Sequence, residues 1–427
     1  MVAYPSLDRL ADLQWHRKDP RPVAGTGPTY LEEVDVPDRA LAPPRGTRPR
    51  NRRALILGAA SDLFARRGYD QIGMSDLAEA VAIGPSALYR HFSSKQNLLR
   101  EVIIGGLAPM RQLLENLNLA DQSTASAQLA ALCLDERHLG VLWQREARRL
   151  SLNDYARVRT EVREIGRRLT DRVRAARPEL DRRTADLVTW ATLAVLMSPS
   201  FHDLEMPRPA YDELLAELAG LVLETSLPSA FAAPSPPPVG PVLLPASRRE
   251  ALLAQAVRMF AAQGFASVGM EDIGNAVGIT GPSVYNHFPS KLDMLRTAFQ
   301  RGTAALLMDV STIYQTSSGA ADALRRLVVS YIRFSQVHHD LIGLLITEVE
   351  HLPEVERHAA RRAQHNYLTE WVHLLQLMYP ELEATAARIR VHSAVAVAND
   401  TARTPHLRHN PDVPAAIESI CGRLLGL

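Results

Sequence analysis

The sequence contains few cysteines and no long apolar run, and both absences exclude classes of protein. Its two cysteines, Cys133 and Cys421, lie far apart and form no Cys-x-x-Cys or metal-ligand pattern, which favours buried free thiols in a reducing compartment. No stretch of about 18 apolar residues occurs, which excludes a membrane span. The first residues lack the basic start and apolar stretch of a secretory signal. We therefore expect a soluble, cytoplasmic protein.

The sequence also lacks enzyme motifs and a strong net charge. Phosphate-binding loops, nucleophile elbows and paired carboxylates in a recognisable setting do not occur, so we expect neither an enzyme nor a cofactor. The 427 residues are 46% apolar and 22% charged, with a net charge of +1. This composition is typical of globular domains, and the length predicts at least two. A nucleic-acid binder of this composition must concentrate its positive charge locally.

An internal repeat divides the chain. Residues 52–100 and 248–296 align at an offset of 196 without a gap, and 20 of the 49 positions are identical. A weaker match follows at an offset of 202, where residues 178–180 and 380–382 are both Pro-Glu-Leu. The offset changes by six residues around residues 105–135. The sequence therefore predicts two tandem copies of one structural unit.

Lysine is rare, since the chain has 45 arginines and only three lysines. Lys18 lies outside the repeat, whereas Lys95 and Lys291 occupy the same position in its two copies. A compact ammonium group and a planar guanidinium group are not interchangeable. The placement indicates a site that requires lysine, with coincidence as the alternative because lysines are so few.

Each copy of the repeat begins with the pattern of a helix-turn-helix. Apolar residues recur at helical spacing over residues 55–64 and are followed by Gly68, which suits a helix C-cap. A short helix is predicted from Met74 to Val81, then a tight turn at residues 82–84, then a second short helix beginning at Pro85. In the other copy Thr280 is the expected N-cap. Such a pair of helices places the second in the DNA major groove.

The segment after the second short helix combines a lysine with a helix start. It reads Tyr-Arg-His-Phe-Ser-Ser-Lys over residues 89–95 and Tyr-Asn-His-Phe-Pro-Ser-Lys over residues 285–291. Ser94 and Ser290 are expected to cap the next helix, and Asp293 follows Ser290 at capping-box spacing. A helix N-terminus beside a lysine is a favourable phosphate site. Phe92 and Phe288 are interpreted as core residues.

Both copies resemble the TetR/AcrR family, through Tyr-x-His-Phe-x-Ser-Lys and the preceding Asp-Leu/Ile-x-x-Ala-Val. The resemblance implies an all-α fold in which a three-helix DNA-binding head sits on a larger helical body. It implies phosphate contacts for Tyr89, His91, Lys95, Tyr285, His287 and Lys291. It also implies which residues occupy the recognition helices. These are Pro85, Ser86, Ala87 and Arg90 in the first head, and Gly281, Pro282, Ser283 and Asn286 in the second. For each polar residue the alternative is a solvated helix surface.

Two glycines depart from the family pattern. The family usually has threonine at the start of the first paired helix, where this chain has Gly73 and Gly269. Glycine is an acceptable N-cap but offers no side chain, so we expect no side-chain contact to phosphate there.

The repeat and its flanks define the expected domains. Residues 1–47 contain many prolines and are expected to be a disordered extension. Heads are predicted at residues 48–104 and 247–299, bodies at 105–225 and 300–427, and a Pro-rich linker at 226–246 that reaches on the order of 60 Å. A basic arm precedes the first head and comprises Arg45, Arg48, Arg50, Arg52 and Arg53. Such an arm reaches into the minor groove or lies along phosphates, and the alternative is a solvated tail. The second head has only Arg248 and Arg249.

The family resemblance implies an effector cavity between the helices of each body. Candidates to line it, or alternatively to be plain core, are Trp143, Tyr155, Trp190, Met197, Phe334, Tyr367, Trp371 and Met378. An apolar cavity suits a lipid, sterol-like or drug-like effector. His351, His358 and His365 recur every seven residues, which separates neighbours by about 10 Å on a helix, so we expect no metal site.

These features predict a ligand-responsive transcriptional repressor that binds double-stranded operator DNA. One chain supplies two heads, so we expect an intramolecular pseudo-dimer closed by residues 182–198 and 384–400, with further self-association left open. The alternatives are an activator or effector-independent regulator, and a helical enzyme that acquired DNA-binding heads. No catalytic constellation supports the last.

Overall fold

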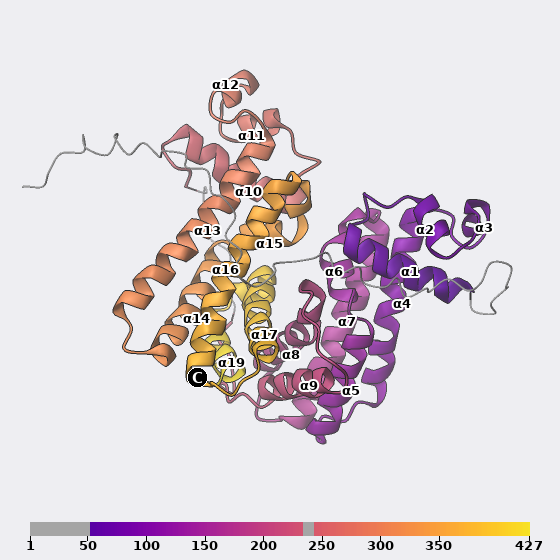
Figure 1. Ribbon diagram of the computed structural model, residues 1–427, viewed down its shortest axis with the longest axis vertical. Coiled ribbons are helices and arrows are strands. Elements are labelled where there is room, and N and C mark those ends of the chain that lie inside the picture. Colours follow the sequence, from indigo (N-terminus) through magenta and orange to yellow (C-terminus); the bar gives the residue numbers. More distant parts are fainter. Residues whose placement is uncertain (1–51, 234–242) are drawn as a thin grey trace, which may run out of the picture. The chain divides into compact units, whose positions relative to one another are not determined.

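Residues 52–233 and 243–427 are described by a computed structural model, and every regular element within those ranges is a helix (Figure 1). The all-α fold expected from the sequence is therefore confirmed. The predicted extension of residues 1–47 lies outside the described residues. The same holds for three arginines of the predicted basic arm, Arg45, Arg48 and Arg50. No described helix is long and apolar enough to cross a membrane.

The two halves of the chain repeat the same order of helices. The first half contains α1 (Arg52–Arg67), α2 (Met74–Ala80), α3 (Pro85–Tyr89), α4 (Lys95–Asn116), α5 (Gln122–Asp135), α6 (Leu139–Gln144), η2 (Glu146–Arg149), α7 (Leu152–Ala176), α8 (Arg182–Met197), η3 (Ser198–Phe201) and α9 (Ala210–Leu223). The second half contains α10 (Arg248–Gln263), α11 (Met270–Ala276), α12 (Gly281–Tyr285), α13 (Lys291–Thr316), α14 (Ala320–Val337), α15 (His339–Thr347), η4 (Val349–His351), α16 (Glu354–Met378), α17 (Ala384–Arg403), α18 (Pro405–Arg408) and α19 (Val413–Leu425).

The six-residue change in repeat offset has a structural origin in two helices. The second half has 26 residues in α13 and 18 in α14, against 22 in α4 and 14 in α5. The connection between α13 and α14 is two residues shorter than that between α4 and α5. The insertion therefore lengthens the body of the second half and leaves its head unchanged.

Each head is a three-helix unit whose apolar side chains meet inside it. In the first head Phe64, Leu88 and Phe92 are fully buried. Gly68 ends α1 with a positive φ of 83°, and its N–H donates to the Phe64 carbonyl. The predicted helices, the glycine C-cap and the core role of Phe92 are thus confirmed. The predicted ends of the heads, at residues 104 and 299, fall inside α4 and α13, so each head continues into its body through one unbroken helix.

Helices late in each half pack against one another. α8 lies against α17, and α9 lies against α19. The hydroxyl groups of Ser198 and Ser393 are buried together, with their oxygens 3.3 Å apart. Buried apolar residues of both bodies belong to one continuous core, whereas the second head has a core of its own. Cys133 and Cys421 are buried free thiols within the shared core, and burial raises the pKa of each.

The described start of the predicted linker is packed against the protein. Phe231 is only 4% exposed. The Ala232 N–H donates to Asp412 Oδ2 at 2.7 Å, and Asn410 donates to the Ala232 carbonyl at 3.1 Å. These contacts tie the segment after the first half to the start of α19. Residues 234–242 lie outside the described residues.

Candidate DNA-binding interface

In the first head a tight turn presents a short helix to solvent. Ala82 in this turn has a positive φ of 52°, and α3 follows with Leu88 fully buried beneath it. The opposite side of α3 exposes Pro85, Ser86 and Arg90, and Ala87 is half-buried. Pro85, Ser86 and Arg90, predicted from the family pattern, are therefore open to solvent, as base contacts require, and Ala87 is partly so.

The second head has the same backbone but different side chains on this face. Gly278 replaces Ala82, with a φ of 72°, and Val284 replaces Leu88 in the core. Pro282 and Asn286 are exposed, whereas Gly281 and Ser283 are half-buried. A Cβ added at Gly281 would lie 2.9 Å from Glu271 Cγ, so this position has no room for a side chain without movement of Glu271.

Thr280 is the N-cap residue of α12, as expected, but its side chain makes no capping hydrogen bond. Its hydroxyl oxygen lies 3.1 Å from that of Ser283 and makes no cap bond to the backbone. One polar group of the recognition helix is thus paired within the free protein.

Tyrosines at the ends of the two recognition helices are the most exposed aromatic residues of the heads. Tyr89 is 53% exposed and Tyr285 is 56% exposed. His91 is also exposed, and His287 is half-buried. A large aromatic side chain left in solvent at the same place in both heads indicates a contact surface.

The two lysines lie against the turn that follows the first helix of each head. Lys95 Nζ is 4.0 Å from the centroid of the Tyr69 ring, and Lys291 Nζ is 4.5 Å from that of Phe265. Lys291 also donates to the carbonyls of Phe265, Ala266 and Val268 at 2.8, 3.3 and 3.2 Å. The sequence did not reveal this internal role, which makes Lys291 a link within its head.

Serine capping of the following helices is confirmed. Ser94 Oγ accepts from Asn97 N–H at 3.0 Å, and Ser290 Oγ accepts from Asp293 N–H at 3.1 Å. The Asp293 carboxylate accepts from the Ser290 hydroxyl rather than from its backbone. The lysine and the helix N-terminus therefore coincide in both heads.

The predicted basic arm is shorter than expected. Arg52 and Arg53 belong to the first turn of α1, because the helix begins at Arg52. Arg53 lies over the Phe92 ring and pairs with Glu101 at 2.8 Å. Arg249 in the same way lies over Phe288 and donates to the His287 carbonyl. Arg52 and Arg53, which were assigned to the arm, are instead part of α1, and cation–π and ion-pair contacts hold Arg53 against the head. Arg248 is exposed in the first turn of α10.

Gly73 and Gly269 act through their backbone. Each glycine begins its helix as N-cap and donates its N–H to an aspartate three residues later, Asp76 at 2.6 Å and Asp272 at 2.8 Å. The departure from the family pattern is thus accommodated by an aspartate in the first helical turn.

A buried glutamate of each body holds the head above it, which sequence reasoning missed. Glu146 Oε2 accepts from Tyr69 N–H at 3.0 Å, and Glu348 Oε2 accepts from Phe265 N–H at 3.4 Å. Burial raises the pKa of Glu348, but bonding to His351 and the positive charge of Arg148 outweigh it and lower the pKa overall. The signal was present, because the two glutamates match at the offset of 202 residues.

The ligand candidates of the first body pack in two places. Trp143 stacks on Tyr155, with ring centroids 6.0 Å apart. The Trp190 ring fills the space beside Gly166, where an added Cβ would lie 2.7 Å from a ring carbon. Met197 is half-buried at the end of α8.

The candidates of the second body mostly form one aromatic cluster. The sequence prediction omitted Tyr331. The centroid of its ring lies 6.4, 5.8 and 5.9 Å from the ring centroids of Phe334, Tyr367 and Trp371. Tyr331 donates to Asn399 Oδ1 at 2.9 Å. Met378 is half-buried near the end of α16. A mainly apolar cleft of about 280 Å³ lies instead between α13 and α16, lined by other residues that include Phe299, Leu307 and Ala360.

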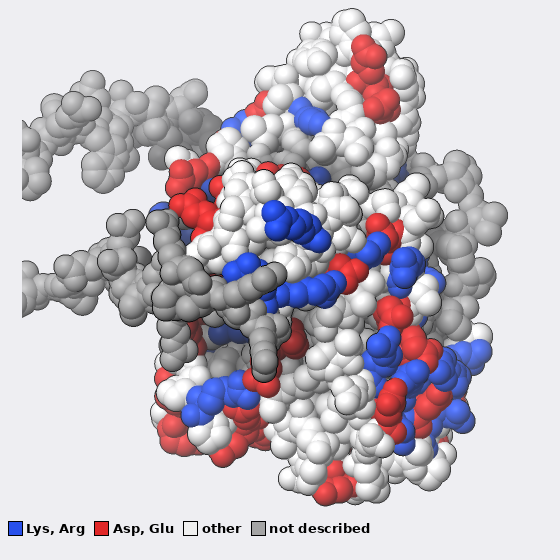
Figure 2. Space-filling view, turned by 90° about the vertical axis from the view of Figure 1, so that its right-hand side faces the viewer, with Lys and Arg blue, Asp and Glu red and all other residues white. Residues whose placement is uncertain are grey.

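Charge is intermixed rather than gathered on the face shown in Figure 2. Lysine and arginine side chains lie beside aspartate and glutamate there, with uncharged surface between them. This agrees with the net charge of +1. The described part of this face therefore offers phosphate no broad basic surface.

Two helix-turn-helix heads with exposed recognition helices define a DNA-binding protein, and comparisons give its family. Residues 56–102 and 252–298 both match the model of the bacterial regulatory proteins of the tetR family. The chain is 31% identical over 157 residues to the HTH-type transcriptional activator FasR of Mycolicibacterium smegmatis, which covers 36% of this chain and 71% of that protein. The chain therefore belongs to the tetR family and is a transcriptional regulator, not an enzyme.

Other similar proteins carry different roles in their names. The HTH-type transcriptional repressor KstR2 of the same organism is 30% identical over 117 residues, covering 26% of this chain and 57% of KstR2. A TetR-family regulator structure from Bordetella parapertussis 12822 aligns with a TM-score of 0.39 at 20% identity, covering 43% of this chain and 94% of that one. The family thus includes proteins named as activators and as repressors.

Proposed function

We propose that one chain binds operator DNA as an intramolecular pseudo-dimer. By their order in the chain, α17 is the counterpart of α8, and α19 is the counterpart of α9. Each of these helices packs against its counterpart in the other half, as in a dimer of two like subunits, and this supports the proposal. Arg390 on α17 pairs with Glu217 on α9 at 2.7 Å, which adds an ion pair across the same faces. A chain that supplies both heads and both packing faces needs no second copy to bind two half-sites.

The two heads are proposed to read unlike half-sites. The observation that carries this proposal is that Tyr89 and Tyr285 are exposed alike, whereas exposed Arg90 corresponds to exposed Asn286. Phosphate contacts position a protein on DNA, and base-edge contacts specify the sequence. Arginine favours guanine and asparagine favours adenine in the major groove. Phosphate contacts are proposed for Tyr89, His91, Lys95, Tyr285, His287 and Lys291.

Repression relieved by an apolar effector is the proposed regulatory mode. The mainly apolar cleft between α13 and α16 supports it, since small-molecule sites are concave and mostly apolar. An effector acts only to the extent that it prefers the state released from DNA. The relative named as an activator favours activation as the second candidate. A promoter reporter separates the two, because deleting a repressor raises transcription and deleting an activator lowers it.

The stoichiometry on DNA tests the pseudo-dimer. Mass photometry of the full chain with a duplex that holds one minimal operator should give one 47.1 kDa protein per duplex. A duplex in which one half-site is scrambled should bind the same single chain more weakly. A minimal complex that contains two chains would contradict the proposal.

A further inference from the structure

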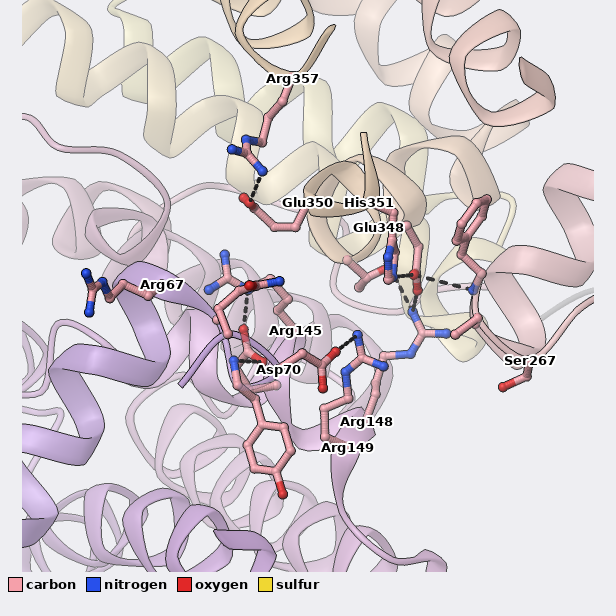
Figure 3. A pocket seen from close by; sticks show the side chains of 18 of the residues that line it. Arg67, Asp70, Arg145, Arg148, Arg149, Ser267, Glu348, Glu350, His351 and Arg357 are labelled. Atoms are coloured by element: carbon pink, nitrogen blue, oxygen red, sulfur yellow. Dashed lines mark hydrogen bonds and ion pairs between the residues drawn. The ribbon is translucent and has the colours of Figure 1, made fainter. Parts of the chain in front are cut away.

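A charged cleft of about 550 Å³ lies where the head–body junctions of the two halves meet (Figure 3). Arginines of the first half that line it come from the end of α1 and from around η2: Arg66, Arg67, Arg145, Arg148 and Arg149. The second half contributes Arg357 and Arg361, both on α16. Four carboxylates also line the cleft, and Asp62 just outside it pairs with Arg66, so seven guanidinium groups face five carboxylates. The cleft therefore has an excess of positive charge.

The ion pairs within the cleft do not use all of this positive charge. Arg149 pairs with Asp70 at 2.7 Å. The single carboxylate of Glu350 is shared by Arg357 at 3.3 Å and Arg361 at 2.7 Å. Arg67 is exposed and pairs with no carboxylate among the described residues. Donors from both halves thus remain available to an anion.

We propose that this cleft binds a small organic phosphate of nucleoside-diphosphate size, at a site separate from the body cleft. One guanidinium group can bind two phosphate oxygens at once through two parallel N–H donors. The volume lies within the roughly 300–1,000 Å³ of small-molecule sites. The concave, arginine-lined shape concentrates the positive potential that an anion with several charges requires.

The cleft also connects the two halves, so its ligand affects the heads. Arg148 of the first half donates to Thr347 Oγ1 at 2.8 Å, to Glu348 Oε1 at 3.0 Å and to the Ala261 carbonyl at 3.3 Å. Glu348 in turn accepts from Phe265 N–H in the second head. An anion that draws Arg148 toward itself weakens this support. If the heads bind DNA as proposed above, the anion lowers operator affinity, and the operator lowers anion affinity by the same factor.

Calorimetric titration of the full chain with ADP, without DNA and at low salt, tests the site. We expect one ADP per chain. Replacing two accessible lining arginines, Arg67→Gln with Arg361→Gln, should weaken ADP binding at least tenfold. The matched control is Arg159→Gln with Arg163→Gln on α7, which removes two exposed arginines that pair with no carboxylate among the described residues. The control should change ADP affinity less than twofold.

Two results would overturn the assignment: no ADP binding by the wild-type protein, and equal losses of ADP affinity in the cleft variant and the control. Citrate binding by a protein that does not bind ADP excludes the phosphate class. Equal losses in the cleft variant and the control indicate only general electrostatic attraction. A cleft variant with a DNA salt slope lower by about two, in a protein that does not bind ADP, makes the cleft a DNA-backbone contact instead.

Failure of the site and failure of the proposed function are distinguishable. A chain that binds ADP through the cleft arginines but binds no operator supports the site and contradicts the function. A chain that binds its operator with unchanged affinity in saturating ADP contradicts the coupling between cleft and heads.

Discussion

The imidazole rings of His202 and His392 lie 4.6 Å apart, one from each half of the chain. Burial is the main cause that lowers the pKa of His202 to about 2 and that of His392 to about 4. Positive charge adds to this effect, from His392 and then Arg137 at His202, and from His365 and then Arg388 at His392. Both rings are therefore neutral in the folded protein at neutral pH.

The first prediction is that the free energy of unfolding decreases below about pH 6.5. As pH falls, the two histidines bind protons in the unfolded chain before they do so in the folded protein, because in the unfolded chain their pKa stays near 6.5. Stability is complete above that value and is lost as pH falls toward about 4, by up to roughly 1.4 kcal/mol per pH unit for each histidine. Urea unfolding at several pH values measures this. His202→Gln with His392→Gln should flatten the profile, and an equally steep profile in that variant would contradict the account.

The second prediction concerns the turn before each recognition helix. Ala82 and Gly278 have positive φ angles of 52° and 72° at equivalent positions. A residue with a Cβ pays about 1 kcal/mol in this region, and glycine does not. Ala82→Gly should therefore stabilise the first head, and Gly278→Ala should destabilise the second by about that amount. Denaturant unfolding measures both, and changes of the same sign would refute the explanation.

The third prediction concerns the bond between Glu146 and Tyr69. Glu146→Ala leaves the Tyr69 N–H without its acceptor and should cost about 1–3 kcal/mol of stability. It should also weaken operator binding, because the first head loses its support from the body. Glu146→Gln keeps an acceptor oxygen and serves as the matched control. Equal effects of the two variants on urea unfolding would mean that charge, not this hydrogen bond, is what matters.

The fourth prediction is that Lys95 and Lys291 bind phosphates. Lys95→Ala and Lys291→Ala should weaken binding to operator and to unrelated duplex DNA by similar factors, and each should lower the salt slope by about one. Lys291→Ala should in addition destabilise the second head, because three carbonyls lose their donor. Titrations at several salt concentrations measure the slopes. A loss restricted to the specific operator would argue for base contacts instead.

Local patterns predicted the heads because the evidence for them lies within short segments. Gly68, Pro85 and Ser94 mark helix ends by their own backbone preferences, and each is found where expected. The repeat offset then transferred each assignment to the second half without further evidence. Tyr89 and Tyr285 were expected to contact phosphate through the family resemblance alone, and both are exposed.

Contacts between distant segments were not predictable in this way. Tyr69 and Glu146 are 77 residues apart, and Arg148 and Glu348 are 200 apart. Which partners meet depends on how the body helices pack, and no periodicity encodes it. The same reason explains why Arg53 was assigned to a free arm although it folds over Phe92, and why the arginine-lined cleft was not foreseen.

The fifth prediction is the central claim, that one chain reads two unlike half-sites. Selection of binding sequences from random DNA by the full chain tests it most directly, with Arg90→Asn as the variant that makes the two heads alike at this position. We expect two different half-sites in the selected DNA, and a changed preference in only one of them for the variant. Selection of a perfect inverted repeat by the wild-type chain would contradict the account.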